Sequence, residues 1–308
     1  MTGPLDHFAK LRARIEARLS ELISLEVPAE PLEGALKYSL LAPAKRVRAV
    51  LMIVAARELG GKEEDALDLA SALEMIHAAS LILDDLPAMD DAETRRGLPA
   101  NHRVFGEATA ILAAVGLLNR SYGVAAAAER LSLDQRIAAI DVLQWAVGLD
   151  GLVRGQQDDL ADSRASLTPA DLERMYARKT GALFAAAAEC GAIIAEKPAL
   201  RDVMRRFGLD LGVGFQILDD VLDARATADR AGKDVDKDNG RATFASLLGA
   251  CEAAALARAK IESALIAARA AAKSAGGDGH MFAAFAGRLA GAFYDLMPEF
   301  PVGLAASG

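Results

Sequence analysis

Two segments of this 308-residue chain, residues 108–118 and 181–195, are apolar around almost the whole circumference of a helix. Such a helix is stable in water where other helices enclose it. Apolar residues at three-to-four spacing recur along most of the chain, and aromatic residues are only 5% of it, which favours helices over sheet. No low-complexity linker or repeat marks a domain boundary. The sequence therefore predicts an all-α fold, a helical bundle that forms one domain over residues 1–308.

The charge balance restricts the partners that this chain can have. Its formal net charge is -8, which argues against a nucleic-acid partner, because such a partner calls for a basic face. The first residues lack the apolar region of a signal peptide, and no uncharged run approaches the roughly 18 residues of a membrane span. Cys190 and Cys251 lie in Ala-rich helical sequence, so we expect two buried thiols in a reducing compartment. A cytoplasmic protein without a membrane span is the simplest interpretation.

An unusual concentration of charge follows one of the apolar helices. The stretch LILDDLPAMDDAETRRG, residues 81–97, contains two acid pairs separated by a proline and followed by two arginines. On one continuous helix Asp84 and Asp90 would point in different directions. Pro87 disfavours helix at the preceding residue, so it can end the helix and let Asp90 fold back toward Asp84. The first acid cluster is therefore expected to converge at a helix end.

A second acid cluster, FQILDDVLD at residues 215–223, also follows an apolar helix. Asp219 and Asp223 are four residues apart and share a helix face, with Asp220 beside them. One such cluster alone is as readily a solvated helix end. Two clusters at the mouth of an apolar interior would be costly without cations, and Mg²⁺ shared with a phosphate-bearing substrate suits paired carboxylates. No His or Cys spacing indicates a zinc site.

Basic residues complete the pattern. They occur in separate places along the chain, namely Lys45, Arg46, Arg48, Arg95, Arg96, Lys179, Lys233, Lys237 and Arg241. Together with the two acid clusters they indicate a site for two polyanionic ligands, at least one of them held through Mg²⁺. A glycine-rich phosphate loop is absent from the sequence, which argues against an ordinary nucleotide site.

The order of these motifs resembles a known family. AKRVR, HAASLILDDLPAMDDAETRRG, GLVRGQQDDL, ARKTGAL, FQILDDVLD and GKDVDKDNGRAT occur in that order over roughly residues 35–248. In this the chain resembles the trans-prenyl diphosphate synthases, most of all the bacterial carotenoid-pathway geranylgeranyl diphosphate synthases. The resemblance implies helices around a central active-site cavity (the isoprenoid synthase fold) and a homodimer. It also implies head-to-tail condensation of isopentenyl diphosphate with an allylic diphosphate, which can be dimethylallyl, geranyl or farnesyl diphosphate.

The same resemblance implies roles for particular residues. Three Mg²⁺ ions on the allylic diphosphate would be held by Asp84, Asp85, Asp90, Asp219, Asp220 and Asp223. Cationic groups on that diphosphate would be Arg95, Lys179 and Lys233. The isopentenyl diphosphate site would contain Lys45, Arg48, His77 and Arg96. The groups nearest the reacting carbon would be Lys179, Thr180 and Gln216. Arg241 stands where a lysine is usual and keeps the charge, and without the resemblance His77 could equally be a hydrogen-bonded core residue.

Product length is expected to follow from small residues upstream of the first acid cluster. Relatives that stop at farnesyl diphosphate have a bulky aromatic residue at the position of Ala79, and Ser80 beside it is also small. We therefore expect geranylgeranyl diphosphate as the main product. The alternatives are a farnesyl diphosphate synthase and a non-catalytic partner subunit, although such subunits normally lack one acid motif. Pro43-Ala44 and Ala49 depart from the usual residues near Lys45 and Arg48, and residues 224–240 are expected to form a polar lid loop.

Overall fold

The protein is described here by a computed structural model that covers residues 4–24, 29–161, 167–231 and 242–296. Apart from one two-stranded antiparallel ribbon, β1 (Thr94–Arg95) with β2 (Leu98–Pro99), the regular structure in these ranges is helical. The helices of the first half are α1 (Pro4–Leu22), α2 (Leu32–Leu40), α3 (Val47–Glu58), α4 (Glu63–Asp84), α5 (Asn101–Phe105), α6 (Glu107–Ala126) and α7 (Leu133–Val147). Those of the second half are α8 (Leu152–Asp159), α9 (Pro169–Tyr176), the π-helical η2 (Ala177–Gly181), α10 (Ala182–Ile194), the short 3₁₀ turn η3 (Pro198–Leu200), α11 (Arg201–Ala231), α12 (Phe244–Leu248), α13 (Ala250–Ser274) and α14 (His280–Leu296).

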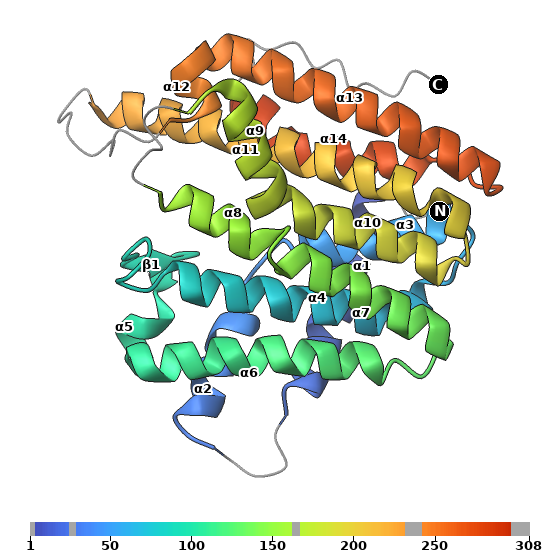
Figure 1. The fold of residues 1–308 in the computed structure, drawn as a ribbon, viewed down its shortest axis with the longest axis horizontal. Coiled ribbons are helices and arrows are strands. Elements are labelled where there is room, and N and C mark those ends of the chain that lie inside the picture. Colours follow the sequence, from blue (N-terminus) through green and yellow to red (C-terminus); the bar gives the residue numbers. More distant parts are fainter. Residues whose placement is uncertain (1–3, 25–28, 162–166, 232–241, 297–308) are drawn as a thin grey trace.

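The centre of the bundle is α10, in which every residue is buried. It packs against α3, α4, α7 and α11, and Figure 1 shows it between the α13 edge and the α6 edge of the molecule. Small side chains make up much of α10, so that neighbouring helices approach closely and are packed at high density. The expectation that residues 181–195 form an enclosed helix is therefore confirmed.

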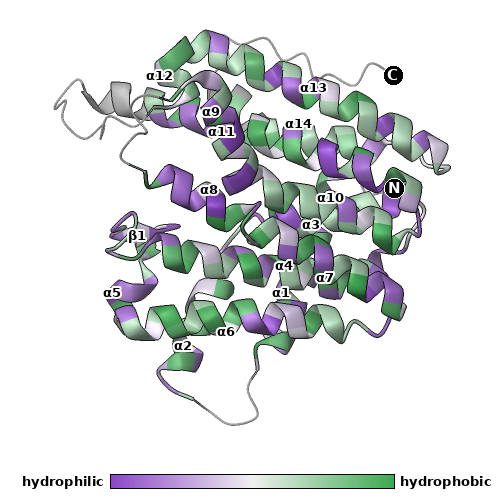
Figure 2. Ribbon diagram, in the orientation of Figure 1, coloured by the Kyte–Doolittle hydropathy of each residue, from purple (hydrophilic) through white to green (hydrophobic). Residues whose placement is uncertain are grey.

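Helix α6 is enclosed on one side only. Ala110, Ala113 and Leu117 are fully buried against the neighbouring helices, but Leu112 is 59% exposed and Val115 is 56% exposed. The expectation that residues 108–118 are surrounded within this chain is therefore wrong. The physical reason is position: α6 lies at the edge of the bundle, where α2 and α4 cover one face, and hydrophobic residues continue around its other face (Figure 2).

Two helices of the described chain, α4 and α6, are long and apolar enough to cross a membrane when judged by length and composition alone. This is weak evidence, because the core helix of a globular protein passes the same test. In α4, 67% of the most apolar stretch is buried inside the protein, and in α6 the share is 39%. α4 therefore fits the description of a core helix.

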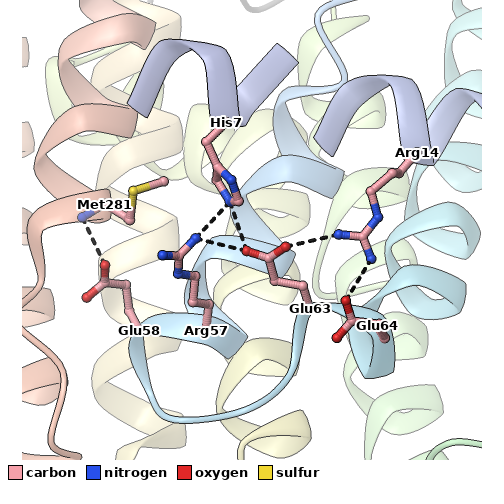
Figure 3. A network of polar contacts seen from close by, with 7 residues as sticks. All are labelled: His7, Arg14, Arg57, Glu58, Glu63, Glu64 and Met281. Atoms are coloured by element: carbon pink, nitrogen blue, oxygen red, sulfur yellow. Dashed lines mark hydrogen bonds and ion pairs between the residues drawn. The ribbon is translucent and has the colours of Figure 1, made fainter. Parts of the chain in front are cut away.

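An ionic network joins α1 to the turn between α3 and α4 (Figure 3). The carboxylate of Glu63 accepts hydrogen bonds of 3.0 Å from both Arg14 and Arg57. At the end of α3, the carboxylate of Glu58 accepts a 2.9 Å hydrogen bond from the backbone N–H of Met281, in the first turn of α14. Glu58 thus satisfies an N–H group that a helix terminus leaves without an intrahelical partner. The network fixes the first and last helices on the α3–α4 pair that carries much of the cavity wall.

Two sequence expectations need correction. Residues 224–231, expected in a polar lid loop, belong to α11, because ARATADRA contains no glycine or proline to end the helix before Gly232. The rest of the expected lid, residues 232–240, lies outside the described residues. Cys190 is buried as expected, but Cys251 is exposed, because it lies in the first turn of α13 on the side turned to solvent.

Candidate active site

A cavity of about 840 Å³ opens between the start of α3, the end of α4, α8, η2 and α11. Many of the side chains that the sequence singled out line it: Lys45, Arg48, His77, Ser80, Asp84, Arg95, Arg96, Lys179, Thr180, Gln216 and Asp219. Apolar residues such as Leu152, Leu183 and Phe215 cover other parts of the wall. Charged and apolar groups in the wall of one cavity suit a ligand with an anionic head and an apolar tail.

In the first acid cluster Asp90 folds back toward Asp84, as the position of Pro87 predicted. α4 ends at Asp84, and the backbone N–H of Asp90 donates a 3.0 Å hydrogen bond to the carbonyl oxygen of Asp84. The pKa of the Asp84 carboxyl is raised, first by burial and also by the nearby charge of Asp90, although Lys179 opposes the shift. Asp84 therefore faces the cavity as a carboxylate whose negative charge is poorly compensated by the protein.

The next residue, Asp85, has a different surrounding. It is 3% exposed, and its Oδ1 accepts a 2.8 Å hydrogen bond from Nε of Arg95. Adjacent residues on a helix point about 100° apart, so Asp84 and Asp85 cannot face the same ligand equally. Asp85 fixes the guanidinium of Arg95 at the cavity wall.

The second acid cluster lies on α11. The pKa of Asp219 is raised by burial and by the like charge of Asp223, while Lys45 and Arg48 oppose the shift. Burial also raises the pKa of Asp223. Both clusters thus contain carboxylates that lack full compensation for their charge, which suits a cation with oxygen ligands. Within the described ranges, no three His, Cys, Asp or Glu side chains lie close enough together to hold a metal ion by themselves.

Lys179 lies close to two carboxylates. Its Nζ is 2.6 Å from Oδ2 of Asp159 and 3.7 Å from Oδ2 of Asp84. It is part of η2, and π-helical turns within α-helices are frequent at functional sites. Gly155 of α8 permits this placement, because a Cβ there would lie 2.3 Å from the backbone nitrogen of Lys179.

A buried cationic group, Arg48, also lines the cavity. Nη1 of Arg48 lies 3.2 Å from Nε2 of His77, and the Arg48 guanidinium lies 4.8 Å from the centre of the Phe184 ring. Burial, together with the charge of Arg96, lowers the pKa of Arg48 to about 10, while Glu74 and Asp219 oppose the shift. Burial and the adjacent guanidinium groups also hold the pKa of His77 well below its usual value, so its imidazole is neutral.

Sequence reasoning missed Glu74, which is 2% exposed on α4. Its Oε2 lies 3.5 Å from Nη1 of Arg46, and its Oε1 accepts a 3.3 Å hydrogen bond from the backbone N–H of Ala49. Arg46 also donates to the carbonyl oxygen of Leu40 across 2.7 Å. Glu74 therefore supports the turn that carries Lys45 and Arg48. The available signal was a lone carboxylate three residues before His77, on the same face of an apolar helix.

A hydrogen-bonded chain crosses from η2 to α11. The Thr180 hydroxyl donates to Oε1 of Gln216 across 2.8 Å, and Nε2 of Gln216 donates to Oδ1 of Asp220 across 3.2 Å. The Tyr176 hydroxyl donates to the other oxygen of Asp220. Thr180 and Gln216 line the cavity, whereas Asp220 is absent from its lining.

The remaining expected site residues lie elsewhere or fall outside the description. Ala79 is 2% exposed within the core, and the open space reaches Ser80 without reaching Ala79. Asp90 and Asp223 are exposed and are absent from the lining of the cavity. Lys233 and Arg241 lie outside the described residues.

Comparison with known proteins adds an independent line of evidence. The family described as polyprenyl synthetase matches residues 29–275. A geranylgeranyl diphosphate synthase from Pantoea ananas is 41% identical over 247 residues, which are 79% of this chain and 81% of that protein. A farnesyl diphosphate synthase from Bacillus subtilis is 38% identical over 255 residues, 80% of this chain and 86% of that protein. The crystal structure of a geranyltransferase from Helicobacter pylori superposes with a TM-score of 0.82 at 26% identity, covering 94% of this chain and 99% of that one.

Proposed function

Because this chain belongs to the polyprenyl synthetase family, we propose that it condenses isopentenyl diphosphate with allylic diphosphates to make geranylgeranyl diphosphate. The observation that carries the proposal is one cavity lined by two kinds of anion-binding group. The under-compensated carboxylates of Asp84 on α4 and Asp219 on α11 suit a metal-bound diphosphate, and the guanidinium of Arg48, beside the neutral His77, suits direct contact with an anion. Two diphosphates can thus be held by different chemistry.

Mg²⁺ is the metal that this donor set fits, because all the facing ligands are carboxylate oxygens. Asp84 and Asp90 would hold Mg²⁺ ions on one side of the cavity, and Asp219 and Asp223 would hold them on the other. Three ions would bind in all. When bound, Mg²⁺ supplies positive charge where the departing diphosphate becomes more negative.

The remaining roles belong to the side chains of the protein. Arg95 and Lys179, with Lys233, would bind the allylic diphosphate. Lys45, Arg48, His77 and Arg96 would bind isopentenyl diphosphate, and Arg241 is a further proposed substrate-binding residue. Breaking the allylic carbon–oxygen bond releases diphosphate and leaves a carbocation, which the oxygen atoms of Thr180 and Gln216 would stabilise. The double bond of isopentenyl diphosphate attacks this cation, a new carbon–carbon bond forms, and the resulting cation loses a proton to the departing diphosphate. The apolar wall around Phe215 would exclude water that quenches the cation.

Small residues support geranylgeranyl diphosphate as the product. The chain has Ala79 five residues before Asp84, and α4 packs against α6, which contributes the buried Ala113 and Ala114. Farnesyl diphosphate is the second candidate, and the observation that favours it is that the open cavity ends at Ser80. A non-catalytic partner subunit is disfavoured, because both acid motifs are intact.

The exposed face of α6 supports a homodimer. Leu112 and Val115 of α6, with Leu133 and Ile137 of α7, are each more than half exposed, and a second copy of the chain would cover them. Leu112→Glu should shift the sedimentation coefficient from that of a dimer to that of a monomer, whereas the wild-type protein sedimenting as a monomer would contradict the proposed homodimer.

The cytoplasm is the proposed compartment, supported by two cysteines that form no disulfide.

A direct assay tests the proposed reaction. Purified protein is incubated with Mg²⁺, isopentenyl diphosphate and either dimethylallyl, geranyl or farnesyl diphosphate, and the products are separated by chromatography. We expect geranylgeranyl diphosphate from each primer and no product when a chelator removes the metal. Failure to elongate any of the three primers would overturn the proposal.

A further inference from the structure

We propose that Asp220 and Tyr176 are positioning residues that fix the orientation of the Gln216 amide, and that Asp220 acts in this way instead of as a metal ligand. The inference rests on the proposed prenyl transfer, because it assigns a role within that reaction. Its starting point is the different surrounding of two adjacent aspartates. Asp219 lines the cavity, whereas Asp220, turned by about 100° on α11, does not.

Both carboxylate oxygens of Asp220 accept hydrogen bonds from the protein. Oδ1 accepts from Nε2 of Gln216 across 3.2 Å, and Oδ2 accepts from the hydroxyl of Tyr176. An ionised carboxylate is an acceptor only. A metal ion bound to Asp220 would have to share or replace these contacts, while the neighbouring Asp219 faces the cavity directly.

The acceptor character of Asp220 decides which end of the Gln216 amide faces which way. An amide has a donating NH₂ end and an accepting oxygen end, and the hydrogen-bond network assigns them. With Nε2 directed to Asp220, Oε1 is left beside the Thr180 hydroxyl at 2.8 Å, at the cavity wall. The reversed amide would place its oxygen against a carboxylate and its NH₂ group toward the developing carbocation. Asp220 therefore keeps the negative end of the amide dipole on the side where positive charge forms.

Tyr176 fixes the carboxylate in turn. The residue is 4% exposed, and its ring packs edge-on against Phe244 of α12 with 5.6 Å between ring centres. A ring held in this way presents its hydroxyl from one direction. Tyr176 and Thr180 both belong to the continuous α9–η2–α10 segment, so the two ends of the hydrogen-bonded chain are anchored on one element and its middle on α11.

Magnesium titration separates a positioning role from metal binding. For Asp219→Asn, the Mg²⁺ concentration that gives half the maximal rate should rise by about tenfold. For Asp220→Asn, kcat should fall by about tenfold, the effect of one lost hydrogen bond, while the half-saturating Mg²⁺ concentration stays at the wild-type value. An increase in that concentration equal to the one for Asp219→Asn would overturn the inference. A wild-type enzyme that elongates no primer would instead overturn the proposed function.

A double-mutant cycle tests the path through Gln216. Tyr176→Phe keeps the ring against Phe244 and removes only the hydroxyl, so kcat should fall several-fold, by less than about tenfold, with both Michaelis constants unchanged. In a Gln216→Ala background the same substitution should have no further effect on kcat, because the group being oriented is gone. Equal losses in both backgrounds would refute the role. Tyr38→Phe is the matched control, since it removes a hydroxyl that donates a 2.8 Å hydrogen bond to the carbonyl oxygen of Pro99, outside this chain of contacts.

Discussion

Nη1 of Arg48 and Nε2 of His77 are 3.2 Å apart in the wall of the cavity. A guanidinium group has only donors, so Nε2 of His77 is the acceptor, and the ring proton is on Nδ1. Burial and the nearby guanidinium groups lower the pKa of His77, which keeps the imidazole neutral and able to accept this bond. A protonated His77 would bring a second positive charge against Arg48.

This pair predicts a pH dependence of stability. In the unfolded chain His77 takes up a proton as the pH falls through its ordinary pKa of 6.5, whereas in the folded protein it does not. The unfolded state then binds more protons, so the free energy of unfolding should decrease below that pH, by up to about 1.4 kcal/mol per pH unit. His77→Gln, which can still accept from Arg48, should lack this part of the slope. Denaturant unfolding at about pH 7 and about pH 5 measures the difference, and identical slopes would contradict the assignment.

The acid clusters predict loss of activity without loss of fold. Asp84→Ala and Asp219→Ala should each reduce turnover by about a thousandfold, because each removes a ligand for the charge that neutralises the diphosphate. The raised pKa of each carboxyl means that its ionised form is disfavoured in the folded state, so stability near neutral pH should be unchanged or higher. Steady-state rates and thermal unfolding check both parts. A variant with near-normal turnover would remove that aspartate from the metal site.

The two kinds of anion-binding group predict a division of labour between the substrates. Arg95→Ala should raise the Michaelis constant for the allylic diphosphate, because Asp85 holds that guanidinium beside the first acid cluster. Arg48→Ala should raise the constant for isopentenyl diphosphate, each by about tenfold. Lys179→Ala should follow Arg95, and Lys45→Ala should follow Arg48. Initial rates over both substrate concentrations separate the effects, and equal changes in the two constants would exclude separate pockets.

The packing around Ala79 predicts a shift in product length. Ala79 is 2% exposed, so Ala79→Tyr should fill the space that the last isoprene unit requires, at a cost of about 1–3 kcal/mol in stability. Chromatography of the products should then show farnesyl diphosphate in place of geranylgeranyl diphosphate, with turnover retained. Ala79→Ser, a much smaller change, should leave the product unaltered. Farnesyl diphosphate as the final wild-type product would refute this account of the cavity floor.

Residue spacing was sufficient to predict the helical fold and the convergence of the first acid cluster. Pro87 ends α4, and the bond from Asp90 to the Asp84 carbonyl is the expected return of the chain. Spacing could not distinguish which aspartate of an adjacent pair faces the ligand. Asp84 and Asp219 line the cavity while Asp85 and Asp220 bind protein side chains, and that choice depends on helix rotation set by packing far from the motif.

Burial was the least predictable property. Leu112 and Val115 continue an apolar pattern that has no partner within the described chain, so the pattern alone overstated how far α6 is enclosed. Glu74 was missed for the opposite reason, because a buried carboxylate on an apolar helix has no sequence signature apart from its position. Its partners Arg46 and Ala49 are 25 or more residues away along the chain, and only the fold brings them together.

The π-helical turn at Ala177–Gly181 sets the directions in which Lys179 and Thr180 point. A π turn accommodates one residue more than the α-helical turn it replaces, so deleting one residue there would give a regular α-helix in which α9 and α10 keep nearly the same phase. The side chains within the turn would change direction instead, and Tyr176 and Thr180 would no longer face Asp220 and Gln216 together. A shorter and more regular helix would be favourable in isolation, yet it would break the alignment of the cavity. Within this segment, chain length by itself encodes catalytic geometry.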